Sequence, residues 1–252
     1  MKWAVGLLWA IGLGVCLPVA ADANVQFSAI AVQSAPDGRS REARMFVGDN
    51  QVRMERRKDD ADMVEIYDMQ AQRVILLVPG QKVYMQRDLP EGVAVNPMLP
   101  KSKANPCSTL PGSSCRQLGK EMLYDRSVSK WEVTLERKGK MLRSLHWIDD
   151  ERFMSLRDAW PDGTVTEVKL IGMEALNGRP SERWQKTMTS VSGEQKVSMQ
   201  WYDPEIQIMT REELPGGFFR ELKSIEVAPQ PPTLFEAPAG YQQLEPEEPG
   251  ER

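Results

Sequence analysis

The residues of this chain that could do acid–base chemistry are few and widely spaced. His146 is the single histidine, and it stands between Leu145 and Trp147 in a segment with the alternation of a β-strand. We expect its ring to face away from those two neighbours. No Ser-His-acid spacing, metal-ligand cluster or phosphate-binding loop is recognisable. The preferred interpretation is a surface or hydrogen-bonded histidine, in a protein without catalytic residues, metal or cofactor.

Charged side chains gather in three short runs. Two of them are the adjacent carboxylates Asp59-Asp60 and Asp149-Asp150. Because successive strand residues point to opposite faces, neither pair makes an acid/base dyad, and we expect solvated turn residues. The third run, Arg56-Arg57-Lys58, is typical of a solvated turn, and a contact with lipid headgroups is the alternative.

Cys107 and Cys115 lie in a Pro-rich segment, 89–117, that has no periodicity and reads as a long loop. In an exported protein such an isolated pair predicts a disulfide. A redox or metal pair is the alternative. The spacing is not that of a Cys-x-x-Cys motif, and no histidine lies nearby in the sequence, so the disulfide is favoured.

Large apolar side chains form the sharpest candidate for a binding surface. Four tryptophans occur at equivalent places in two predicted hairpins, with methionines near them. One interpretation makes them core anchors, and the other makes them the lining of an apolar groove. The candidate groove residues are Trp131, Met141, Trp147, Trp184, Met188, Met199 and Trp201.

The elements that must position these side chains form a unit that occurs twice in the sequence. Residues 118–171 make the first copy, and residues 172–241 hold the second copy and a C-terminal segment that docks on the sheet. A fixed period of roughly fifty residues indicates a duplicated supersecondary unit. Each copy reads as an antiparallel meander with Gly-containing turns. Matching positions include Gly119 and Gly172, Glu121 and Glu174, Arg126 and Arg179, Trp131 and Trp184, Trp147 and Trp201, Asp149 and Asp203, and Glu167 and Glu221.

The rest of the chain also reads as β-structure. Residues 24–88 predict an antiparallel meander with a hairpin across Gly48-Asp49-Asn50, and the apolar run 74–78 predicts a strand covered on both faces. A short helix is expected only around 116–123. Leu234, Phe235 and Tyr241 are expected to dock on the sheet, and the Glu- and Pro-rich residues 242–252 to be disordered. Residues 24–241 are expected to form one continuous domain.

Composition and the N-terminus place the chain among exported proteins. It has 252 residues, a 41% hydrophobic fraction and a formal net charge of −4, which gives no basic stripe for nucleic acid. Residues 1–23 have a charged start, a short apolar stretch and the small-x-small site Ala21-Asp22-Ala23. This pattern predicts a cleaved signal peptide and no transmembrane span in the mature chain. Lipidation at Cys16 is the disfavoured alternative, because Val15 before it is bulky.

Several stretches together resemble exported bacterial proteins of the LolA/LolB lipoprotein-carrier superfamily. They are 43–55, 78–85, 131–149 and 234–241, and they cover motifs along most of the mature chain. The resemblance implies a mainly β fold with few short helices, in which a curved antiparallel sheet forms an open half barrel around an apolar concavity. It also implies binding of acyl chains, lipids or lipoprotein segments. The second copy of the tryptophan unit departs from the pattern and implies a wider sheet or a second one.

These observations lead to one preferred function and two alternatives. The preferred one is a periplasmic, non-enzymatic protein that holds a lipid, acyl chain or lipoprotein segment in its concavity. An envelope protein-interaction or stress-sensor module would instead use a sheet edge or the Pro-rich segment to contact a protein partner. An accessory subunit of an enzyme is the third.

Overall fold

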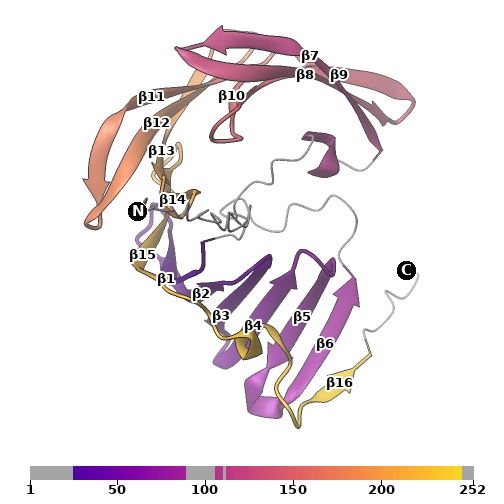
Figure 1. Ribbon diagram of the computed structural model, residues 1–252, viewed down its shortest axis with the longest axis vertical. Coiled ribbons are helices and arrows are strands. Elements are labelled where there is room, and N and C mark those ends of the chain that lie inside the picture. Colours follow the sequence, from indigo (N-terminus) through magenta and orange to yellow (C-terminus); the bar gives the residue numbers. More distant parts are fainter. Residues whose placement is uncertain (1–24, 89–105, 110–111, 246–252) are drawn as a thin grey trace, which may run out of the picture.

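The computed structural model describes residues 25–88, 106–109 and 112–245 (Figure 1). The predicted signal peptide, residues 89–105 of the Pro-rich segment and residues 246–252 lie outside this range. The described chain is almost entirely β-structure. Its helical elements are three short 3-10 turns, η1 (Pro79–Gln81), η2 (Pro106–Thr109) and η3 (Pro232–Phe235). The prediction of a mainly β fold is confirmed.

The N-terminal part is a meander of six strands that follow one another in space as in sequence. The turn between the second and third strands spans residues 48–50, where Asn50 adopts a positive φ of 56°. In the fifth strand the consecutive residues Val74 and Ile75 are both buried, so this strand is covered on both faces. The strands are β1 (Phe27–Ser34), β2 (Ser40–Val47), β3 (Gln51–Lys58), β4 (Ala61–Asp68), β5 (Arg73–Val78) and β6 (Val83–Asp88).

The C-terminal part is a second meander, and it contains both copies of the repeated unit. Equivalent tight turns at Tyr124-Asp125 and Asn177-Gly178 have positive φ at both residues, as two-residue hairpins with right-handed twist require. The strands are β7 (Ser113–Leu123), β8 (Arg126–Arg137), β9 (Lys140–Asp149), β10 (Ser155–Ala159), β11 (Val165–Leu176), β12 (Arg179–Thr189), β13 (Gln195–Asp203), β14 (Ile208–Glu213) and β15 (Phe219–Val227). The last strand, β16 (Gln242–Leu244), lies outside this meander, beside β6.

The two meanders join into one sheet of 16 strands, in the order β16-β6-β5-β4-β3-β2-β1-β15-β14-β13-β12-β11-β10-β9-β8-β7. The junction is the antiparallel pair β1–β15, in which Phe27 lies opposite Val227. Neighbouring strands are antiparallel throughout, except for the parallel pair β16–β6. The two copies of the repeat therefore extend a single sheet.

The sheet is strongly curved and does not close. Figure 1 shows β7–β14 as an arc that faces the wall made by β2–β6, with β1 and β15 between them and η2 on the inner side of the arc. The strands β7 and β16 stand at the two edges of the described sheet. The predicted curved, open antiparallel sheet is confirmed.

Three local predictions are corrected. Residues 116–123 are not helical but belong to β7, which pairs with β8 along its whole length, from Ser113 opposite Leu135 to Leu123 opposite Arg126. Pairing with a long partner strand overrides a weak helical preference. The predicted loop 89–117 accordingly gives way to strand at Ser113. Of the tail expected to be disordered, Gln242–Leu244 forms β16 beside β6.

Buried side chains form three clusters along the sheet. One lies around Phe27, Met45 and Leu222, and a second around Trp147, Leu156 and Trp184. The third is closed by η3, whose Phe235 is 2% exposed and packs against Ile66 and Leu77. Leu234 and Tyr241 pack on this cluster too, so the C-terminal segment acts as a strap over β3–β5.

Each copy of the repeat packs in the same way on the strands after it. The connection after β9 brings Met154 into the cluster that holds Val168 and Trp184 of the next strands. The connection after β13 brings Ile206, and the start of β14 brings Ile208, into the cluster with Leu222, Phe27 and Met45. Each connection thus buries its apolar residues on the strands that come next in the sheet, which gives a continuous core from short repeated units.

Candidate functional site

An open cavity of about 690 Å³ lies on the sheet over β9–β13, close to the hairpin tips. Its apolar wall comes from Leu142, Trp160, Pro161 and Met188. Trp160 and Met188 remain 43% and 40% exposed, which is unusual for side chains of this size. The other lining residues are polar or charged: Asp162, Thr164, Ser190, Glu194 and Lys196. A mostly apolar hollow with a few convergent polar groups is typical of a small-molecule site.

Strand register gathers these side chains on one face. Directly paired residues of neighbouring strands share a face, and alternate residues of one strand share it as well. On β11–β13 the pairs Thr166–Met188 and Met188–Lys196 follow this rule. On β9 and β10 the pair His146–Asp158 lies on the same face as Leu142 and Trp160. The cavity and His146 therefore belong to one surface.

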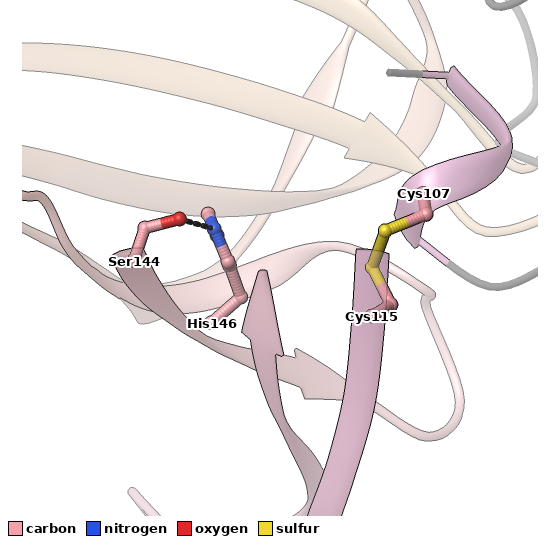
Figure 2. Close-up of a disulfide and its surroundings, with 4 residues drawn as sticks. All are labelled: Cys107, Cys115, Ser144 and His146. Carbon is pink, nitrogen blue, oxygen red and sulfur yellow. Dashed lines mark hydrogen bonds between the residues drawn. A yellow bond between two sulfur atoms is a disulfide. The ribbon is translucent and has the colours of Figure 1, made fainter. Parts of the chain in front are cut away.

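That surface is the inner one. Cys115 pairs with Val133, and Val133 pairs with Ser144, so these three residues share a face across β7, β8 and β9. The disulfide from Cys115 ties Cys107 of η2 to this face, and η2 lies inside the arc (Figures 1 and 2). We call the face that carries Cys115, Ser144 and His146 the inner face.

His146 is the centre of a hydrogen-bonded chain on the inner face. Its Nδ1 is 2.7 Å from Oδ1 of Asp158, and its Nε2 is 2.7 Å from Oγ of Ser144. Figure 2 shows Ser144 and His146 side by side on β9. A carboxylate only accepts, so Nδ1 carries a proton, and in the neutral ring Nε2 accepts the proton of the serine hydroxyl. The His146 and Asp158 side chains are each only 14% exposed.

Two neighbours hold this chain in place. Ser155 donates a hydrogen bond to the same Oδ1 of Asp158. The Trp160 ring stands edge-on to the His146 ring, with 5.4 Å between the centroids, and its Nε1 donates to Thr166 at 3.2 Å. Trp160 thus contacts the histidine and also lines the cavity.

The sequence did not indicate the hydrogen-bonded chain of Ser144, His146 and Asp158. A histidine with satisfied nitrogens was expected, and the structure supplies partners for both. Alternation could have placed Ser144 beside His146, since they are two residues apart on one strand. Asp158 comes from β10, and a register shift between Ser155 and Arg157 decides which residue lies opposite His146. Such a bulge has no reliable local signature.

The seven predicted groove residues are divided between two faces. Trp131 pairs with His146 and so lies on the inner face, as do Trp184 and Met188. By the same alternation Met141, Trp147, Met199 and Trp201 point to the opposite face. Of the seven, Met188 lines the cavity, whereas Trp147, Trp184 and Trp201 are buried. Trp147 and Trp184 belong to one buried cluster.

Trp147 and Trp201 have equivalent surroundings in the two copies. The Trp147 Nε1 donates to Glu121, and the Trp201 Nε1 donates to Glu174. Arg157 lies 5.3 Å from the centroid of the Trp147 ring, and Arg211 lies 5.5 Å from that of Trp201. These contacts repeat from copy to copy and match the interpretation of these tryptophans as anchors of each hairpin.

Of the adjacent carboxylates in the sequence, one pair lies in an exposed turn and the other includes a buried residue. Asp59 and Asp60 are exposed and adopt positive φ values, as expected of turn residues. Asp149 is different, since it is only 1% exposed and its carboxylate accepts hydrogen bonds from Arg126 and from two backbone N–H groups. The expectation of a solvated Asp149 is therefore wrong: a buried carboxylate needs these partners, and the next turn provides them.

The predicted disulfide is confirmed. Cys107 and Cys115 are bonded, with their Cα atoms 5.8 Å apart. The bond fixes η2 on the inner face beside β7 and β8. Among the described residues, no group of three or more His, Cys, Asp and Glu side chains could hold a metal ion. In the same part of the chain, no helix has the length and apolar character needed to cross a membrane.

Comparison with known proteins gives similarities of fold class only. No model of a protein family matches the chain, and no curated protein matches it. A LolA superfamily protein from Nitrosomonas europaea is 12% identical, with 86% of this chain and 91% of that one covered and a TM-score of 0.37. A DUF1329 family protein from Desulfovibrio piger is 12% identical over 85% and 91% of the chains, with a TM-score of 0.33. A hypothetical lipoprotein from Escherichia coli is 16% identical over 81% and 85%, with a TM-score of 0.31.

A member of the LolA superfamily, which the sequence motifs resemble, is thus among the similar structures. At these TM-scores the similarity leaves the site to be argued from this chain alone.

Proposed function

We propose that this protein binds an apolar chain of an amphiphile, such as an acyl chain, a lipid or a lipoprotein segment, on its inner face. The observation that carries the proposal is the cavity of about 690 Å³ with its wall of Leu142, Trp160 and Met188. It lies within the range of volumes that small-molecule sites occupy. In the proposal the protein holds its ligand, and holding requires no chemical conversion.

Apolar burial would drive the binding. Each buried methylene contributes about 0.8 kcal/mol, so a chain of several methylenes that covers Trp160 and Met188 outweighs a substantial ordering cost. Lys196 in the lining lies 3.8 Å from Glu194, and an anionic headgroup or carboxylate would have to share this ammonium with that exposed pair. An amphiphile with one apolar chain and one acidic end fits both properties of the cavity.

The proposed place of action is the periplasm. The support is the N-terminal segment, with its charged start, apolar stretch and small-residue cleavage site near Ala23. The disulfide is consistent with it, because such bonds persist in oxidising compartments.

Native mass spectrometry of the mature protein, with lipid extraction, tests the proposal. We expect stoichiometric co-purified acyl lipid, or saturable binding of a fluorescent fatty acid. Met188→Glu should weaken that binding about tenfold or more, since it places a charge in the apolar wall. Val197→Glu is the matched control, because Val197 is similarly exposed but lies on the opposite face. Purified protein that carries no lipid and does not bind the fluorescent fatty acid would refute the proposal.

An envelope protein-interaction or sensor module is the second candidate, and the edge strand β7 favours it. Most of its side chains are exposed, and on its outer side no described strand pairs with it. An extended segment of a partner could add there as a further strand. Photocrosslinking from Lys120, in the middle of this edge, would capture such a partner, and the fatty-acid probe would then leave the crosslink unaffected.

A further inference from the structure

We propose that Ser144 is a nucleophile that accepts an acyl group from an ester bound in the inner-face cavity. The inference rests on the proposed function, because the apolar wall is what would hold the acyl chain. It goes beyond that function, since it assigns a reactive atom to the site. The geometry that points to it is the chain Ser144–His146–Asp158, with both hydrogen bonds at 2.7 Å.

The direction of the hydrogen bonds gives each residue a role. Asp158 fixes the tautomer with the proton on Nδ1, and this leaves the Nε2 lone pair facing the Ser144 hydroxyl. A base within hydrogen-bond distance of a serine, itself oriented by a carboxylate, is the arrangement that activates serine nucleophiles on unrelated folds. Ser155 is a positioning residue, since it holds the Asp158 carboxylate through Oδ1.

The chain lies at the margin of the cavity. Leu142, two residues before Ser144 on the same strand face, lines the cavity, and so does Trp160, which contacts the His146 ring. An ester whose acyl chain rests on Leu142 and Trp160 has its carbonyl group near Ser144. Thr164, beside Trp160 in the lining, offers a hydroxyl of the kind that stabilises negative charge on a carbonyl oxygen.

The reaction balances without a cofactor. Oγ of Ser144 attacks the carbonyl carbon of the ester while its proton passes to Nε2 of His146. The bond between that carbon and the alcohol oxygen breaks, and the alcohol leaves with the proton from Nε2. The product is an acyl ester of Ser144. Water, deprotonated by the same nitrogen, then releases a carboxylic acid and restores the serine.

A fluorophosphonate with a long alkyl chain, used on the full mature protein, tests the assignment. We expect a single adduct by intact mass, located on Ser144 by peptide mapping of the wild-type protein. Ser144→Ala should abolish it. His146→Gln and Asp158→Asn should slow it by about a hundredfold, the usual contribution of a positioned base. Ser129→Ala is the matched control, because the Ser129 hydroxyl donates to the carboxylate of Asp150 and not to a histidine. It should label as the wild type does.

The outcomes separate the two proposals. Binding of the fluorescent fatty acid without any adduct on Ser144 overturns this inference and leaves the proposed function standing. An adduct on another residue, or equal labelling of Ser144→Ala, also overturns it. If Ser144→Ala fails to fold, peptide mapping of the wild-type protein still shows whether Ser144 carries the adduct. An adduct on Ser144 that disappears in Met188→Glu supports both the reactive serine and the apolar cavity that serves it.

Discussion

Asp149 and Asp203 occupy the same position in the two copies of the repeat, and each ends a strand with the same set of bonds. Arg126 donates to Asp149, and Arg179 donates to Asp203. Oδ1 of each aspartate accepts a backbone N–H two residues further on, at 2.9 Å in both copies. The two copies of the repeat thus share a buried ion pair that closes a turn, in addition to their apolar pattern.

Asp149→Asn should destabilise the protein by about 2–3 kcal/mol, since it leaves Arg126 facing a neutral amide. Asp203→Asn should cost a similar amount because its surroundings are equivalent. Urea unfolding of each variant measures the cost. A negligible loss in both variants would show that the ion pair is offset by its own desolvation.

The same carboxylate predicts a pH dependence. Burial by itself raises the pKa of Asp149, but the hydrogen bonds from Arg126 and from the backbone of Arg152 and Glu151 outweigh it and lower that pKa below its ordinary value. A lowered pKa in the folded state means stability that is full above about pH 4 and is lost as the pH falls through the folded-state pKa. Asp149→Asn should therefore lose less stability on acidification than the wild type, as urea unfolding along a pH series would show.

The raised pKa of Tyr124 predicts a loss of stability at alkaline pH. Partial burial and the hydrogen bond that its hydroxyl donates to Glu167 raise its pKa to about 12. The raised pKa means stability that is full below about pH 10 and is lost as the pH rises through 12. Near-ultraviolet titration should show tyrosine absorbance that titrates near pH 12, from Tyr124 and from Tyr67, whose pKa is also raised to about 12, and Tyr124→Phe should remove the share of one tyrosine. Ionisation of all tyrosines around pH 10 would contradict it.

Gly48 should tolerate no side chain, because of the strap that crosses it. A Cβ at this position would lie 2.6 Å from Cε2 of the buried Phe235. Gly48→Ala should therefore cost about 1–3 kcal/mol in the free energy of unfolding. Gly80→Ala is the control, since a Cβ there meets nothing within 4 Å. Equal stability of the two variants would mean that the strap shifts freely.

The disulfide should contribute stability through the short loop that it closes. Replacing Cys107 and Cys115 together by serine should lower the free energy of unfolding by about 2–3 kcal/mol on the chain-entropy estimate. Reduction of the wild-type protein should have the same effect as the double substitution. If thermal unfolding is the same with and without the bond, its role is confined to holding η2 on the inner face.

Much of the fold could be predicted from local patterns. Alternation and Gly-containing turns indicated most strands, since side-chain facing and turn conformation depend on a few neighbouring residues. The helix expected at 116–123 was wrong because β7 is defined by its partner β8, which no local pattern reveals. Asp149 was misjudged for the same reason, as its partner Arg126 lies on another strand.

The sequence by itself determined the β class, the duplication, the cysteine pair and the candidate apolar residues, because each is written in composition, spacing or period. Only the tertiary structure decided that both copies extend one sheet and that Trp131 and Trp147 face opposite ways from it. It also decided that Asp158 lies opposite His146, beside the cavity. These features depend on strand register and on a bulge, and a shift of one residue in register would turn every side chain of the shifted strand to the other face of the sheet.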